Sequence, residues 1–266
     1  MNLFDAMFLE PFLTGLCFAV LLPLFGVYLR LRDEWLAALA FAQTAAAGSL
    51  IALAFGWPLM LGGMLAAASA AALKALFENA LRGVQGAAYA MLLVAAWAVS
   101  VLLVANLPLA ERLGHALFDG QIYLTDRDHF LAAVGCLALS AIGLQRLSRA
   151  LLLSHFFPEL FRARGRSARQ AHLAFDLMAA LGLALATMSI GVMAAFALIF
   201  IPPFIACRRA KSWRQALLLA VVIGVLAHAL AFVAALWLDQ PFGPLLAILL
   251  VLAGAFGSLG LHHDRR

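Results

Sequence analysis

Long apolar runs are the feature that most constrains how this chain can fold. Such runs recur along its 266 residues, and a helix needs about 20 apolar residues to cross a bilayer core of about 30 Å. Hydrophobic residues make up 66% of the chain and charged residues 12%, against roughly 45 to 50% and 25% in soluble domains. So little polar surface cannot cover a water-soluble particle. The sequence therefore predicts an all-α, polytopic protein of the lipid bilayer and excludes a soluble enzyme, a disordered chain and a nucleic-acid-binding module.

Nine membrane spans are expected in one transmembrane domain that covers residues 1–266. Seven follow directly from the apolar runs: Phe8 to Leu29, Trp35 to Phe55, Trp57 to Leu76, Ala87 to Ala105, Phe130 to Leu147, Gln215 to Trp237 and Gly243 to Leu261. The stretch from Ala171 to Cys207 would form a helix of about 55 Å, nearly twice the thickness of the bilayer core. We therefore expect it to turn back at Ser189-Ile190-Gly191 as two spans. The first ten residues lack Lys and Arg, so the first run is predicted to be a permanent span and not a cleaved signal peptide.

The distribution of basic residues predicts the orientation. With the N-terminus outside and the C-terminus in the cytoplasm, nine spans place 16 of the 18 Lys and Arg residues on the cytoplasmic side, all but Arg112 and Arg127. This bias is the one that orients helical membrane proteins. It leaves an external loop from Asn106 to His129 and a cytoplasmic loop from Gln145 to Gln170. The cytoplasmic loop carries a turn signal at Phe157-Pro158-Glu159 and an amphipathic stretch that closes at Gly165, which is typical either of a docking helix or of a topology signal that touches lipid head groups.

Motifs for chemistry within this chain are missing. The sequence has no Walker lysine loop, no metalloprotease motif and no nucleophile elbow, and it implies no cofactor. An ionisable residue in hydrocarbon is costly and often functional, and His228 lies near the middle of a predicted span. It is either a ligand on a pathway or a neutral imidazole bonded to a neighbouring helix. Interhelical hydrogen bonds are favoured for Gln43 and Thr44, and an anchoring role near Arg169 for Asp176.

Six segments, in this order, resemble the permease subunits of bacterial zinc and manganese ABC importers. They are Arg30 and Arg32 with the run from Trp35 to Gly48, Leu117 to Gly120, Phe156 to Gly165, Gly191 to Met193, Leu198 to Pro202, and Asp239 to Pro244. The resemblance covers most of the chain. It implies a multi-pass protein of the bacterial plasma (inner) membrane that assembles as a homodimer. It also implies a separate cytoplasmic ATPase and an extracytoplasmic metal-binding protein as partners, with no enzyme activity in the permease.

The resemblance implies functional roles for particular residues of this chain. The coupling element that docks on the ATPase corresponds to Phe157, Pro158, Glu159, Leu160, Phe161 and Gly165. The metal-gating Asp and His of the family's second span correspond to Ala37 and Phe41, neither of which can coordinate a metal. The expected translocation pathway is therefore Ala37, Phe41, Gln43, Thr44 and His228, with His228 as the candidate metal ligand.

These features lead to one main hypothesis and two alternatives. The main hypothesis is a permease that imports a divalent metal ion, zinc or manganese, with energy from the partner ATPase. The apolar Ala37 and Phe41 favour instead a metal chelate or a small organic solute, if they face the pathway. A membrane assembly factor without an ATPase partner is the alternative of a different class.

Overall fold

A bundle of helices is what the computed structural model of the chain shows. It describes residues 6–77, 84–120, 122–157, 159 and 168–263, and all the regular elements in these ranges are helical. The predicted all-α class is thus confirmed.

The long helices agree with the predicted spans. Eight are long and apolar enough to cross a membrane: α1 (Ala6–Leu31), α2 (Trp35–Ala54), α3 (Leu59–Phe77), α4 (Gln85–Asn106), α6 (Arg127–Phe156), α8 (Ala168–Ile190), α9 (Val192–Arg209) and α10 (Trp213–Leu238). A further apolar helix, α11 (Phe242–His263), corresponds to the ninth predicted span. Between α4 and α6 lie the short elements α5 (Pro108–His115), η1 (Ala116–Gly120) and η2 (Ile122–Leu124).

The predicted break in the long apolar stretch is confirmed at Gly191. α8 ends at Ile190 and α9 begins at Val192, and Gly191 between them has a φ of 85°, which favours glycine. A Cβ atom on Gly191 would also lie 2.7 Å from the backbone nitrogen of Gly120, itself at a φ of 73°. The segment η1 therefore packs against this turn through two glycines.

One predicted boundary is wrong. The fifth predicted span ends at Leu147 and the cytoplasmic loop begins at Gln145, but α6 continues as a helix to Phe156. Its 30 residues correspond to about 45 Å, more than the bilayer core requires. Hydropathy marks where the apolar environment ends, and a helix can continue past that point into water.

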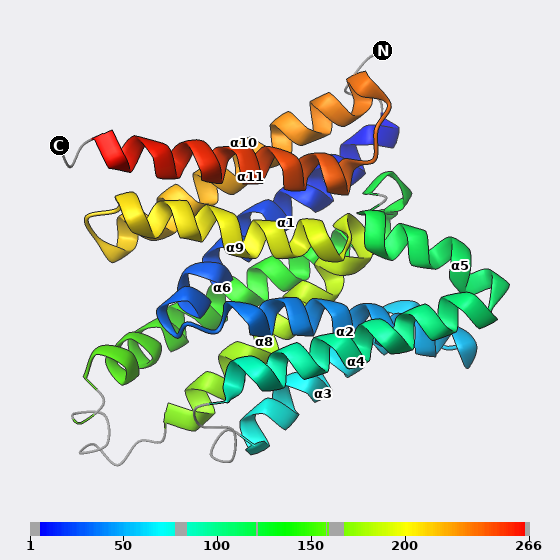
Figure 1. Cartoon of the computed structure of the whole chain (residues 1–266), viewed down its shortest axis with the longest axis horizontal. Helices are drawn as coiled ribbons and strands as arrows, with labels where there is room; N and C mark the ends of the chain where they lie inside the picture. The colour runs from blue at the N-terminus through cyan, green and yellow to red at the C-terminus, as the bar shows by residue number, and fades with distance from the viewer. Residues whose placement is uncertain (1–5, 78–83, 121, 158, 160–167, 264–266) are drawn as a thin grey trace.

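Four helices form the centre of the bundle. α1, α2, α8 and α9 are the most buried of the long helices, and they pack on one another. Figure 1 shows α10 and α11 on one side of this centre and α3 and α4 on the other. Small residues allow a close crossing between α2 and α3, where a Cβ atom on Gly48 would lie 2.5 Å from the carbonyl oxygen of Gly62.

The two ends of the bundle differ. α5 and the start of α1 lie at one end in Figure 1, and the ends of α1 and α9 lie at the other, together with the start of α8. We call the latter the basic end, because Arg30, Arg32, Arg169, Arg208 and Lys211 lie there. It is the end predicted to face the cytoplasm.

Candidate transport pathway and coupling region

The α2 positions of the predicted pathway lie inside the chain's own core. Ala37 and Phe41 are both 0% exposed and belong to the main hydrophobic cluster. In this structure they therefore pack against other parts of the same chain and do not line an open channel.

The polar residues of α2 do not make the interhelical hydrogen bonds expected for them. Thr44 donates its hydroxyl proton to the carbonyl oxygen of Ala40 in the same helix. Gln43 is buried, and its Nε2 atom has no hydrogen-bond partner among the described residues. A buried polar group without a partner is costly, so Gln43, like Ser49 of the same helix, has unused hydrogen-bonding capacity.

His228 lies in an enclosed aromatic setting between α1, α10 and α11. The side chain is fully buried, and its ring is 5.2 Å from that of Phe12 and 5.4 Å from that of Phe242. Nε2 lies 3.1 Å from the carbonyl oxygen of Phe12, a geometry in which Nε2 carries the proton and donates it. Nδ1 then has a free lone pair, and it has no partner among the described residues.

The structure does not gather these pathway residues into one site. His228 contacts α1 and α11, whereas Figure 1 shows α2 and α10 on opposite sides of α9. Within the described ranges there is no group of three His, Cys, Asp or Glu side chains that could hold a metal ion.

A buried ionic network occupies the basic end, and sequence analysis found only one of its members. Asp176 of α8 accepts hydrogen bonds from Arg32 Nη1 at 2.8 Å and from Lys74 Nζ at 2.6 Å. Glu34 is within 2.7 Å of both cations. The network therefore holds two positive and two negative groups. It joins the α1–α2 connection to α3 and α8.

The charges of this network stabilise one another. Burial alone would lower the pKa of Arg32, but the carboxylates of Asp176 and Glu34 outweigh burial and raise it above the ordinary value. The partner predicted for Asp176 was wrong. Arg169 precedes Asp176 by two helical turns, about 10 Å along the axis, and donates instead to the carbonyl oxygen of Ala75 at 2.9 Å. Lys74 and Asp176, charged residues within apolar spans, were the sequence signal for this pairing.

The first turns of α8 are thus attached on several sides. Besides the network and the Arg169 bond to α3, the imidazole Nε2 of His172 lies 3.1 Å from the hydroxyl of Ser154 in α6. These contacts surround the helix that directly follows the predicted coupling loop.

Only part of the predicted coupling element lies in the described ranges. Phe157 is 58% exposed and Glu159 is also exposed. Pro158, Leu160, Phe161 and Gly165 fall outside the described residues.

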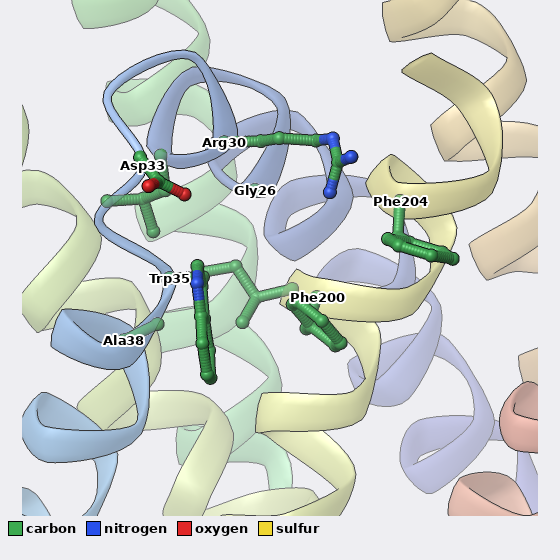
Figure 2. A pocket seen from close by; sticks show the side chains of 9 residues that line it. Gly26, Arg30, Asp33, Trp35, Ala38, Phe200 and Phe204 are labelled. Carbon is green, nitrogen blue, oxygen red and sulfur yellow. The ribbon is translucent and has the colours of Figure 1, made fainter. Parts of the chain in front are cut away.

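Two cavities open beside Arg30 at the basic end. One, of about 310 Å³, lies between the α1–α2 connection and α9 and is bordered by Trp35, Phe200 and Phe204 (Figure 2). The other, of about 460 Å³, lies between α1 and the α9–α10 turn and is bordered by Lys211 and Trp213.

Comparisons with known proteins agree with this architecture. The model of the ABC 3 transport family matches residues 4–259. PsaBC from Streptococcus pneumoniae in complex with Fab has a similar fold, with a TM-score of 0.83 at 17% identity over 96% of this chain and 91% of that one. The structure of an inward-facing conformation of a metal-chelate type ABC transporter also has a similar fold. Its TM-score is 0.75 at 22% identity, over 96% of this chain and 85% of that one. None of the curated proteins matches the sequence.

Proposed function

The chain belongs to the ABC 3 transport family and is therefore a membrane permease subunit of an ABC transporter, and from this premise we propose that it imports a divalent metal ion, zinc or manganese. In this proposal two copies form the pathway in the bacterial plasma membrane. A separate cytoplasmic ATPase docks on each coupling loop, and an extracytoplasmic binding protein delivers the ion. The family match over residues 4–259 carries the proposal, together with the motifs that resemble zinc and manganese permeases.

The attachment of α8 supports a route for coupling. The loop that contains Phe157 and Glu159 connects α6 to α8, so a movement of this loop would be transmitted to both helices. Asp176 then links α8 to Lys74 of α3 and to Arg32, next to the start of α2. The buried network would thus transmit rigid-body motion from the ATPase side to the central helices.

The proposed pathway holds the ion weakly. Ala37 and Phe41 provide no ligands, so nitrogen and oxygen donors must come from elsewhere. His228 Nδ1 has a free lone pair. The side-chain carbonyl oxygen of Gln43 would be a second, weaker ligand. Zinc accepts imidazole readily, and a few weak donors suit a conduit better than a closed four-ligand site. Because His228 is fully buried in this state, contact with the ion requires α1 and α10 to separate.

A metal chelate or a small organic solute is the second candidate. It is favoured by the apolar Ala37 and Phe41 and by the lack of a three-ligand cluster in the described ranges. Family membership leaves the assembly-factor hypothesis without support.

Uptake in cells distinguishes the two cargo classes. The permease would be expressed with the ATPase and binding protein of the same transporter in a strain that lacks its own metal importers. Accumulation of radioactive zinc or manganese is expected, and it should disappear when the Walker lysine of the ATPase is replaced. Uptake only when the metal is supplied as a chelate would support the second candidate and contradict import of the free ion.

A further inference from the structure

Arg30 lies in the last turn of α1 and Arg32 directly follows this helix, but the two residues differ in their partners. Arg32 is neutralised by Asp176 and Glu34. Arg30 makes no ion pair within the described residues, and its guanidinium lies 4.9 Å from the ring centroid of Phe204. Arg208 lies 4.2 Å from the same centroid, so two like charges flank one ring. A cation–π contact contributes only about 0.5–1 kcal/mol at an exposed site and removes no charge, so an anion beside these guanidinium groups would be stabilised.

The larger cavity beside Arg30 is lined by hydrogen-bond donors. Its polar side chains are Arg30, Lys211, Ser212 and Trp213, and none of the residues that line it is Asp or Glu. The indole nitrogen of Trp213 is itself buried, so Arg30 and Lys211 supply the charge that faces the cavity. This composition is complementary to an anion with several acceptor oxygens.

The position of the cavity indicates where that anion comes from. α9 ends at Arg209 and α10 begins at Trp213, so the turn between these two spans is too short to leave the membrane surface. Trp and basic residues at such a turn are typical of headgroup depth on the cytoplasmic side. Basic pockets between helices at this depth recognise anionic lipids.

The smaller cavity shares Arg30 with the larger one and adds an apolar wall of Trp35, Phe200 and Phe204. Asp33 also lines it, but Figure 2 shows Arg30 extending from α1 toward Phe204 and away from Asp33. Asp33 is exposed to solvent, which screens its carboxylate. An acyl chain or a glycerol backbone fits beside these rings.

We propose that these cavities bind an anionic phospholipid of the cytoplasmic leaflet, phosphatidylglycerol or cardiolipin. The phosphodiester accepts hydrogen bonds from Arg30 and Lys211, and the apolar part of the lipid packs on Phe200 and Phe204. The site is independent of the cargo and of the predicted coupling loop.

Native mass spectrometry of the purified permease–ATPase complex tests the proposal. The complex is titrated with phosphatidylglycerol, and the double variant Arg30→Gln/Lys211→Gln is compared with Arg146→Gln/Arg149→Gln. Arg146 and Arg149 are exposed on α6 and border neither cavity. We expect the cavity variant to bind at least tenfold more weakly and the control to stay within twofold.

Two further titrations identify the ligand. Phosphatidylcholine should bind at least tenfold more weakly than phosphatidylglycerol, and soluble glycerol phosphate at millimolar concentration should not displace the lipid. Equal losses in the cavity and control variants would mean diffuse attraction to basic residues and would overturn the proposal. Displacement of the lipid by glycerol phosphate would also overturn it. The same holds if the cavity variant loses the ATPase subunit but still binds the lipid.

Discussion

Lys74 Nζ lies 2.6 Å from Asp176 Oδ2, which joins two residues that are 102 positions apart in the sequence. Their side chains are only 8% and 2% exposed. At this burial neither charge can be left without a partner. The contact therefore fixes α3 against α8 at the basic end.

The first prediction concerns this pair. Asp176→Asn leaves Arg32 and Lys74 with a single carboxylate, and Lys74→Gln leaves an excess of negative charge. Each single variant should lower the free energy of unfolding by about 3–5 kcal/mol, because an unpaired buried charge remains. Chemical denaturation of the purified protein in detergent measures the loss.

The double variant provides the control for this prediction. Lys74→Gln/Asp176→Asn keeps the Arg32–Glu34 pair at 2.7 Å, so the remaining charges balance. It should lose less stability than the sum of the two single variants. Additive losses would contradict a coupled network.

The second prediction tests the coupling loop. Glu159→Arg reverses the charge of an exposed residue in the loop. It should abolish co-purification with the ATPase, or uncouple ATP hydrolysis from uptake, while the protein remains in the membrane. Glu111→Arg, exposed at the opposite end of the bundle, should leave both unchanged. Normal uptake by Glu159→Arg would contradict docking and would mean that the loop only helps to orient the chain in the membrane.

The third prediction separates the two roles open to His228. His228→Gln retains an amide N–H that can bond the carbonyl oxygen of Phe12 but loses the imidazole. If Nδ1 contacts the ion, metal uptake should fall at least tenfold while the amount of assembled complex, measured by size-exclusion chromatography, stays unchanged. If His228 only joins α1 to α10, the Gln variant should transport normally and His228→Leu should lose complex and uptake together.

The fourth prediction compares two glycines. Gly48→Ala brings a Cβ atom to 2.5 Å from the Gly62 carbonyl and should destabilise the protein by about 1–3 kcal/mol, because α2 and α3 must separate. Gly135→Ala, in α6 with no atom within 4 Å of the added carbon, should be neutral or slightly stabilising. Thermal unfolding in detergent measures both. Equal effects would mean that α2 and α3 do not cross at this glycine.

The fifth prediction is the orientation. In a protein whose three native cysteines are replaced, Asp128→Cys should react with an impermeant maleimide from outside the cell and Lys211→Cys only from the cytoplasmic side. Labelling from the same side would contradict the N-out arrangement.

The transmembrane helices could be read from the sequence because a backbone in lipid must satisfy its hydrogen bonds internally. Apolar length therefore predicted the spans, and the length limit of the bilayer predicted the break that Gly191 makes. The end of α6 was missed because Arg146 and Arg149 stop the apolar run but not the helix.

Which faces meet, and which charges pair, was decided only by the tertiary structure. A membrane helix is apolar all around, so its sequence does not distinguish a face that touches lipid from one that touches protein. For that reason neither the burial of Ala37 and Phe41 in the core nor the enclosure of His228 by aromatic rings could be inferred. Asp176 could be singled out from the sequence as a buried charge, but its partners Arg32 and Lys74 come from distant segments, and only helix packing brings them within hydrogen-bond distance.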